Sequence, residues 1–149
     1  MAVKSDITIL AREMSESELQ IMNNGFDLFA KQHGDQAAIK ERYTYVALHN
    51  DKFIGCSSGL VQKFEGKYSS WFYLTDMYVD EAYRKQGIGR KLLVELESQL
   101  ISLGVKKFYT WTKSYEGPSF YKKLGYEVFV DLEDFFYNNG GHIGLLKRL

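Results

Sequence analysis

The sequence predicts one domain of the α/β class, built on a sheet that is partly antiparallel. The chain has 149 residues, which is the size of one domain and leaves little room for a linker and a second core. Short runs of aromatic and β-branched residues, separated by turn-forming residues, indicate hairpins. A long amphipathic helix pattern between two strand patterns indicates a strand-helix-strand crossover. The sheet is therefore expected to be mixed and to form two or three layers.

The first half of the chain is expected to place one helix before three strands. A brief apolar alternation predicts a strand over about residues 6–13. Ser15, followed three residues later by Glu18, has the pattern of a capping box, so a helix should begin there and end at Gly34. A short helical segment is expected at 36–41. The next strand-forming runs, the first two of which should form a hairpin, are 43–48, 53–64 and 69–79.

The second half contains the clearest helix pattern. Apolar residues recur on one face, with charged and polar residues on the other, and Gly104 stands where the helix should stop. The residues of this apolar stripe are Leu92, Leu93, Leu96, Leu100 and Leu103. A strand is expected at 106–112. Pro118 is well placed to open a short helix that runs to about Leu124, and two strands, 126–132 and 143–149, should complete the sheet.

Composition and charge exclude several classes of function. The residues are 45% hydrophobic and 26% charged, which is typical of a globular chain rather than a disordered one. The 19 basic residues balance the 19 acidic ones, so we expect no nucleic acid or membrane partner. Cys56 is the single cysteine, which forbids an intrachain disulfide and a cysteine-based metal site. Residues 1–14 lack the apolar block of a signal peptide, and we expect a cytoplasmic protein.

The segment VDEAYRKQGIGRKLL, residues 79–93, joins the longest strand pattern to the clearest helix and carries the chemistry. Gly87 and Gly89 allow a tight turn and let a ligand approach the backbone. The first amides of a helix lack internal partners and carry a partial positive charge, so they favour an anion. Four basic residues lie within the eight positions from Arg84 to Lys91. The segment therefore predicts a site for a pyrophosphate.

The segment 79–93 matches neither of two common phosphate-binding loops. A mononucleotide loop needs Gly-Lys followed by Ser or Thr, and this triplet is absent. A dinucleotide fingerprint needs a third glycine where this chain has Leu92. The plain alternative is a helix start rich in glycine with a solvated basic rim.

Arg84-x-x-Gly87-x-Gly89, after a strand that ends in Val79, resembles the acetyl-CoA-binding motif of the GNAT N-acetyltransferase superfamily. SFYKKLGYEVF, residues 119–129, resembles the second motif of that family. The resemblance covers essentially residues 5–149 and is strongest between 72 and 129. It implies a central mixed, mostly antiparallel sheet of six to seven strands flanked by about four helices. It also implies that residues 1–149 form a single acetyl-CoA-dependent N-acetyltransferase domain.

The resemblance implies acetyl-CoA as the co-substrate. Amides from Gln86 to Arg90 would hold the pyrophosphate, and the end of the preceding strand would pair with the pantetheine arm as an added strand does. Many members carry Asn and Ala at the positions of Ser114 and Gly117, and Ser114 could still donate a hydrogen bond. The cofactor-binding residues implied are Met77, Tyr78, Val79, Arg84, Lys85, Gln86, Gly87, Ile88, Gly89, Arg90 and Ser114.

Acetyl transfer to an amine also needs a base and an acid. A lysine-like amine has a pKa near 10.4, so its deprotonation at pH 7 costs roughly 4 to 5 kcal/mol. Asp76 is a candidate base through water, although an Asp near a strand end also orders backbone. Thr75 would take its place if the strand carries a bulge. Tyr121 matches the acid position of the family, and a backbone N–H near Met77 would stabilise the oxyanion.

Other residues have plainer interpretations. His142 could join a substrate pocket, but a lone His in a glycine-rich turn is usually a surface residue. The acidic and aromatic run 131–137 could form a wall that binds a cationic amine, or a solvated turn. Cys56 has no basic neighbour in the sequence and is expected to be a small apolar residue rather than a nucleophile.

These observations predict an N-acetyltransferase that transfers acetyl to a primary amine by direct attack in a ternary complex. The acceptor, a small-molecule or peptide amine, stays open because variable loops build such pockets. The aromatic content is compatible with a homodimer. A non-catalytic acyl-CoA-binding module and a protein-interaction domain without a cofactor are the two alternatives.

Overall fold

The computed structural model describes residues 6–35, 38–115, 117–138 and 140–149. The chain divides into two units, Met1–Ala37 and Ala38–Leu149. In the described residues no helix combines the length and the apolar character that crossing a bilayer requires.

The first unit contains one helix, α1 (Glu16–Gln32), and it begins with the predicted capping box. Ser15 Oγ accepts from the Glu18 N–H at 3.2 Å, and the Glu18 carboxylate accepts from the Ser15 N–H at 2.8 Å. Arg12 lies 2.8 Å from the same carboxylate. This cation and the hydrogen bonds with Ser15 lower the pKa of Glu18 to about 2. Gly34, with φ near +75°, follows the helix as predicted.

The predicted strand over 6–13 is wrong. Residues 6–14 contain neither helix nor strand. The apolar alternation there is confined to Ile7 and Ile9, and a strand this short is stable only when a neighbouring strand satisfies its backbone.

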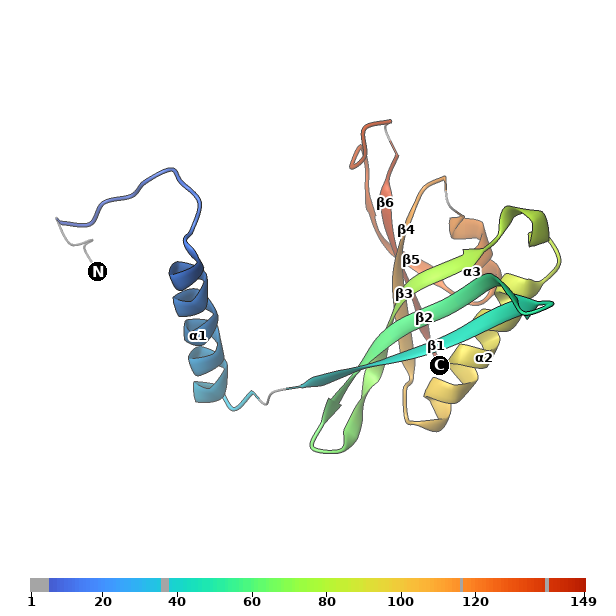
Figure 1. The fold of residues 1–149 in the computed structure, drawn as a ribbon, viewed down its shortest axis with the longest axis horizontal. Helices are drawn as coiled ribbons and strands as arrows, with labels where there is room; N and C mark the ends of the chain where they lie inside the picture. The colour runs from blue at the N-terminus through green and yellow to red at the C-terminus, as the bar shows by residue number, and fades with distance from the viewer. Residues whose placement is uncertain (1–5, 36–37, 116, 139) are drawn as a thin grey trace. The chain divides into compact units, whose positions relative to one another are not determined.

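The second unit is built on one six-stranded sheet with the order β1-β2-β3-β4-β6-β5 (Figure 1). Its strands are β1 (Ile39–His49), β2 (Lys52–Phe64), β3 (Lys67–Val79), β4 (Lys107–Lys113), β5 (Glu127–Leu132) and β6 (His142–Arg148). Its helices are α2 (Ile88–Ser102), α3 (Pro118–Lys123) and the 3-10 turn η1 (Glu81–Tyr83). Among the described strands, only β3 and β4 pair in parallel. The mixed, mostly antiparallel sheet is therefore confirmed.

The helical segment predicted at 36–41 is wrong for the residues that the structure describes. Ile39 to Glu41 form the start of β1, and Ile39 pairs with Lys63 of β2. Residues 36 and 37 lie outside the described residues. Pairing with a long neighbouring strand decides the conformation here, because local helix propensity is weak compared with a ladder of hydrogen bonds.

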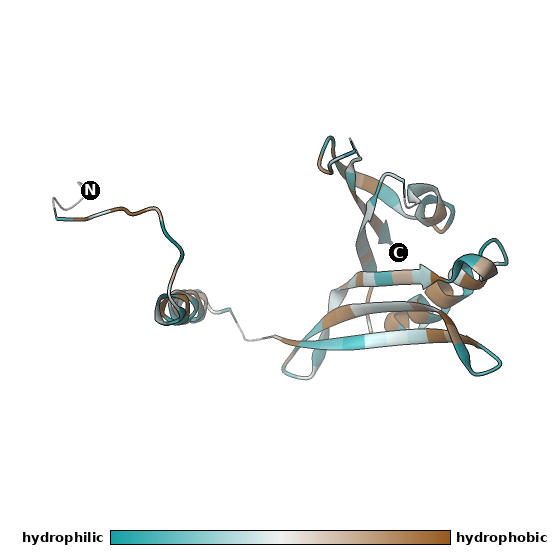
Figure 2. Ribbon diagram, turned by 45° about the horizontal axis from the view of Figure 1, so that its top comes forward, coloured by the Kyte–Doolittle hydropathy of each residue, from teal (hydrophilic) through white to brown (hydrophobic). Residues whose placement is uncertain are grey.

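The core lies between the sheet and α2, which packs against β1, β2 and β3 (Figure 1). Four of the five leucines of the predicted stripe are buried, and Leu103 is partly buried against the same core. Hydrophobic segments recur along α2 and the strands beneath it (Figure 2). The sheet residues that complete this core include Val61, Phe72, Leu74, Phe108 and Leu145.

Gly59 of β2 provides room in this core. A Cβ at this position would overlap the backbone carbonyl of Tyr73 and the ring of Phe72. We therefore predict that Gly59→Ala destabilises the protein by about 3 kcal/mol, since neither a carbonyl nor a buried ring can move away. Gly25→Ala in α1 is the matched control. Its Cβ has nothing within 4 Å, so it should stabilise α1 by up to about 1 kcal/mol. Equal losses in urea unfolding would contradict this explanation.

A buried carboxylate joins α2 to β6 and to the residue that precedes β5. Glu97 is 4% exposed and accepts hydrogen bonds from the Tyr126 hydroxyl and the Lys147 ammonium, both at 3.2 Å. Burial raises the pKa of Glu97, although Lys147 opposes the shift. A raised pKa in the folded state means that ionising Glu97 favours unfolding.

We therefore predict that Glu97 makes the fold lose stability as the pH rises from the ordinary glutamate pKa toward the raised value. Glu97→Gln should flatten this part of the stability curve, above the ordinary glutamate pKa. Glu95→Gln, an exposed change on the same helix, should leave the slope unchanged. Denaturant unfolding at several pH values measures the slope, and parallel curves for wild type and Glu97→Gln would rule out the titration.

Candidate functional site

The sheet opens between its two central strands. The β3–β4 ladder contains four residue pairs and ends at Leu74 with Thr110, although β3 continues to Val79 and β4 to Lys113. Beyond that point β3 stays paired with β2 and β4 stays paired with β6. The two strand edges that face each other across the opening therefore lack a ladder, and their backbone groups are available to a ligand.

A β-bulge lies where the two strands diverge. Ser58 pairs with Asp76 and Gly59 with Leu74, so Thr75 is the extra residue of β3. A bulge is the condition under which Thr75 is expected to take the place equivalent to that of Asp76, and this bulge is present.

A hydrogen-bond network fixes the bulge. The Thr75 hydroxyl donates to Asp76 Oδ2 at 2.6 Å. Arg42 Nη1 donates to the Thr75 hydroxyl at 2.8 Å and to Ser58 Oγ at 2.9 Å, and it lies 3.5 Å from Asp76 Oδ2. One oxygen of Asp76 is thus engaged by Thr75 and Arg42. Arg42 is not predicted from the sequence, because its contacts depend on the register of three strands.

The N-terminus of α2 borders the same opening and has no side-chain cap. Its N-cap is Gly87 in the left-handed region, φ +79°, and the first backbone bond of the helix runs from the Lys91 N–H to the Gly87 carbonyl at 3.1 Å. The amides of Ile88, Gly89 and Arg90 precede that bond and have no intrahelical acceptor. In α1, by contrast, Ser15 and Glu18 cap the corresponding end. A Cβ at Gly87 would meet nothing within 4 Å, and residues 87–90 line a cleft.

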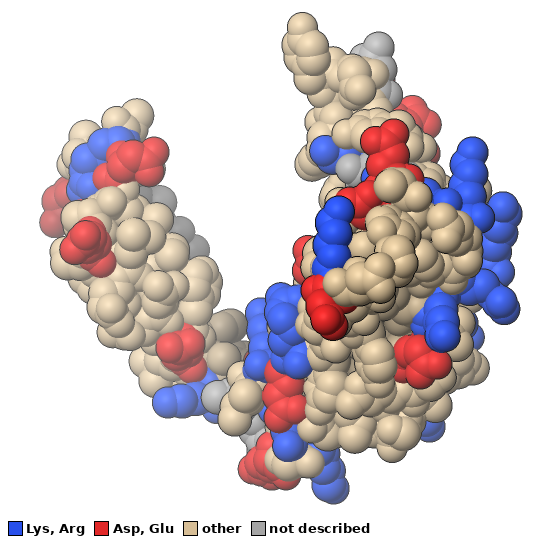
Figure 3. All heavy atoms as spheres, turned by 45° about the vertical axis from the view of Figure 1, so that its right-hand side comes forward, with Lys and Arg blue, Asp and Glu red and all other residues tan. Residues whose placement is uncertain are grey.

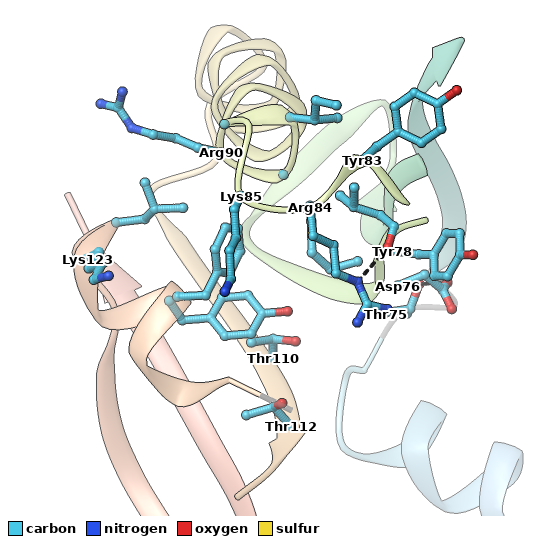
Figure 4. Close-up of a pocket in the computed structure, with 18 of the residues that line it drawn as sticks. Thr75, Asp76, Tyr78, Tyr83, Arg84, Lys85, Arg90, Thr110, Thr112 and Lys123 are labelled. Carbon is cyan, nitrogen blue, oxygen red and sulfur yellow. Dashed lines mark hydrogen bonds between the residues drawn. The ribbon is translucent and has the colours of Figure 1, made fainter. Parts of the chain in front are cut away.

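The loop before α2 is held by hydrogen bonds between its side chains and the backbone, and it carries two cations. Arg84 Nε donates to the Val79 carbonyl at 3.0 Å, which ties the loop to the end of β3 (Figure 4). Lys85 adopts φ +62°, a left-handed conformation that costs free energy for a residue with a Cβ. Asp80 caps η1 by accepting from the Ala82 N–H at 2.9 Å. Arg84 and Lys85 therefore stand beside the uncapped helix end.

These elements enclose a cleft of about 920 Å³. Most of the residues predicted from the sequence line it together: Asp76, Met77, Tyr78, Val79, Arg84, Lys85, Gly87, Ile88, Gly89, Arg90 and Tyr121. Thr75, Thr110, Trp111, Thr112, Tyr115 and Lys123 line it as well, and Arg90 and Lys123 lie at its rim (Figure 4). Thr110, Trp111 and Thr112 of β4 are not predicted from the sequence, because the pattern of one strand does not reveal where β4 diverges from β3.

Two predicted residues do not line this cleft. Gln86 borders a second pocket, on the other side of the loop, between β1 and α2. Ser114 Oγ accepts from the Gly141 N–H at 3.1 Å, and the Ser114 N–H donates to the Gly141 carbonyl at 3.1 Å. Ser114 therefore joins the end of β4 to the start of β6.

Tyr121 is on α3 and lines the cleft. It is 7% exposed, and its ring packs edge-on against Tyr126 at 5.5 Å. Phe120 and Leu124 also pack against the core. The ring of Tyr121 is therefore part of the core and also part of the cleft wall.

The remaining candidates have mixed outcomes. Cys56 is half-buried, and burial raises the pKa of its thiol, with a contribution from the charge of Asp76. Both effects disfavour the thiolate, so the interpretation of Cys56 as a non-nucleophilic residue is supported.

The interpretation of His142 as a surface residue is wrong. It is the first residue of β6, its ring is stacked on Trp111 at 4.3 Å, and its Nδ1 is buried.

Charges on the face of the second unit shown in Figure 3 are mixed in sign, which agrees with the balanced composition. Anion attraction at the cleft is thus a local property of Arg84, Lys85 and the helix end.

Comparisons with known proteins place this geometry in a family. The model of the acetyltransferase (GNAT) domain matches residues 40–128. An acetyltransferase from Bacillus cereus has a similar structure, with a TM-score of 0.76 and 22% identity over 95% of this chain and 98% of that one. A protein from Agrobacterium tumefaciens assigned as an acetyltransferase has a TM-score of 0.71 and 19% identity over 96% and 99% of the two chains.

The PaiA N-acetyltransferase from Thermoplasma acidophilum, solved in complex with coenzyme A, has a TM-score of 0.57 and 18% identity over 89% of this chain and 72% of that one. No curated protein sequence matches the chain. The family model covers the diverging strands, the uncapped helix and the helix that carries Tyr121, and the chain therefore belongs to the GNAT acetyltransferase family.

Proposed function

We propose that the protein is an N-acetyltransferase that transfers the acetyl group of acetyl-CoA to a primary amine by direct attack in a ternary complex. The observation that carries this proposal is the uncapped N-terminus of α2 beside the unpaired edge of β3. The helix N-terminus is suited to a diphosphate, and the unpaired strand edge is suited to an extended chain with amide groups. Coenzyme A contains both groups, joined in that order.

The residues of the cleft fit this co-substrate. The amides of Ile88, Gly89 and Arg90, with Arg84 and Lys85, would hold the diphosphate. The residues of β3 from Met77 to Val79 would hydrogen-bond the pantetheine arm. Acetyl-CoA supplies an activated thioester carbonyl, and a backbone N–H near Met77 would stabilise the oxyanion that develops on it.

Tyr121 is the proposed acid. The amine nitrogen forms its bond to the acetyl carbon as the bond from carbon to sulfur breaks, and the leaving thiolate needs a proton. Tyr121 lines the cleft from α3, and the burial of its ring fixes the direction of its hydroxyl. Its O–H would supply the proton.

Asp76 is proposed to receive the acceptor amine. Its Oδ2 accepts from Thr75 at 2.6 Å and lies near Arg42, which holds the carboxylate in place at the cleft. The Oδ1 atom would attract the ammonium and accept its proton through water. Thr75 fixes the carboxylate for this role.

We further propose that this activity belongs to a single domain of residues 1–149 in the reducing cytoplasm. The support for the domain is the alignment of the Bacillus cereus structure with 95% of the chain. The support for the compartment is the single cysteine.

The diphosphate site has a direct test. Arg84→Glu combined with Gly87→Val should weaken CoA binding by at least about tenfold, because the changes reverse one charge and place a side chain before the helix amides. Gly66→Val is the matched control. Gly66 also has a positive φ and open space, but it lies in the β2–β3 turn. Calorimetry that gives the same Kd for the double variant and wild type would reject this site.

The acid role has its own test. Tyr121→Phe should lower kcat by about 10²- to 10⁴-fold without a change in the Kd of acetyl-CoA, because only the proton donor is lost. Tyr109→Phe, a hydroxyl on β4 outside the cleft, should retain full activity. The measurement is thiol release with a panel of amines. If wild type binds acetyl-CoA but releases no thiol with any amine, the protein is a non-catalytic acyl-CoA-binding module.

A further inference from the structure

The end of the β1–β2 hairpin contacts the loop that precedes α2. His49 is the last residue of β1, and its Nδ1 shares a hydrogen bond of 2.8 Å with the Tyr83 hydroxyl. The two rings also meet edge-on, with centroids 5.4 Å apart and an interplanar angle of 69°, which is a favourable arrangement of aromatic rings. Tyr83 is the last residue of η1 and directly precedes Arg84. We call the pair of side chains His49 and Tyr83 the clasp.

The shape of the hairpin places His49 beside this loop. Asn50 and Asp51 have φ values of +49° and +64°, which are typical of a tight two-residue turn between antiparallel strands. A β-bulge in the same hairpin makes Ile54 an extra residue of β2. The carbonyl of Ile54 accepts a hydrogen bond from the Asp80 N–H at 2.7 Å. The hairpin therefore holds the start of η1 through the backbone and the end of η1 through the clasp.

Tyr83 forms part of the wall between two cavities. It lines the cleft, and it also lines the second pocket between β1 and α2. Its hydroxyl is directed away from Arg84 and Lys85 (Figure 4). The hydroxyl of Tyr83 thus binds the hairpin, while the two cations that follow it in the chain line the cleft.

The loop of residues 80–87, which we call the diphosphate loop, needs such a restraint. Lys85 has a left-handed conformation, φ +62°, that costs free energy, and the start of α2 has no side-chain cap that would offset this cost. The side-chain hydrogen bonds of Asp80 and Arg84 join residues two and five positions apart. The clasp instead joins residues 34 positions apart. It therefore ties a strained loop to a separate element of the sheet.

We propose that His49 is a positioning residue for coenzyme A. It holds Tyr83, so that the diphosphate loop keeps its binding conformation before the co-substrate arrives. This inference rests on the proposed N-acetyltransferase function and adds a residue that does not line the cleft. A protein that binds a ligand in one loop conformation loses apparent affinity in proportion to the population of that conformation. Loss of the clasp therefore weakens the binding of CoA and leaves the chemical step unchanged.

Calorimetry with CoA tests the clasp without turnover. His49→Phe keeps an aromatic ring beside Tyr83 but removes the hydrogen bond, so the Kd of CoA should rise about fivefold, the effect of one neutral hydrogen bond. Tyr83→Phe should give the same rise, and the double variant should bind CoA as each single variant does, because all three lack the same bond. His49→Asn, whose side-chain amide can bond the same hydroxyl, should restore the Kd of wild type. Tyr137→Phe, which removes the hydroxyl of a fully exposed residue, is the matched control and should leave the Kd unchanged.

A kinetic readout separates positioning from a general loss of structure. In His49→Phe the KM for acetyl-CoA should rise, while kcat at saturating acetyl-CoA should equal that of wild type. The inference is overturned by an unchanged Kd in His49→Phe or Tyr83→Phe, by additive effects in the double variant, or by a lower kcat at saturation. A wild type that binds CoA with a Kd independent of the clasp rejects this inference alone, whereas a wild type that binds no CoA rejects the proposed function as well.

Discussion

The site depends on the early end of the ladder between β3 and β4. Backbone N–H and C=O groups need partners, and an unmet buried group costs about 1–3 kcal/mol. β3 satisfies one edge with β2, and β4 satisfies one edge with β6. Past Leu74 and Thr110 the other two edges face each other without pairing. The sheet thus carries unsatisfied hydrogen-bonding capacity at its centre, and a ligand with its own amide groups can meet it.

The two long helices show how the same backbone chemistry serves folding in one place and binding in another. At the start of α1, the Glu18 amide donates to the Ser15 hydroxyl, and the Ser15 amide donates to the Glu18 carboxylate. The first amides of α2 follow Gly87, which has no side chain to offer them. Because each helix end carries the same partial positive charge, the absence of a cap at α2 leaves that charge for an anion. The buried leucines of α2 hold the helix in place.

Local patterns were predicted well, and features that depend on register were not. Three features depend only on residues close together in the sequence, so the sequence alone predicts them: the capping box at Ser15, the leucine stripe of α2 and the glycines at 87 and 89. The strand predicted at 6–13 failed because strand formation depends on a partner elsewhere in the chain. Arg42 contacts two residues of the bulge that lie 33 and 34 positions further along the chain. His142 stacks on Trp111, which lies 31 positions before it. No periodicity along one segment reports such contacts.

Stability and chemistry are divided between different parts of the second unit. The face of the sheet under α2 contains the buried apolar side chains, whereas the opening between β3 and β4 contains polar groups and cations. Tyr121 is the exception, because its ring belongs to the core and its residue also lines the cleft. A proton donor must keep a fixed direction, and the close packing of its aromatic ring in the core provides this. The core position of Tyr121 therefore supports its proposed chemical role rather than competing with it.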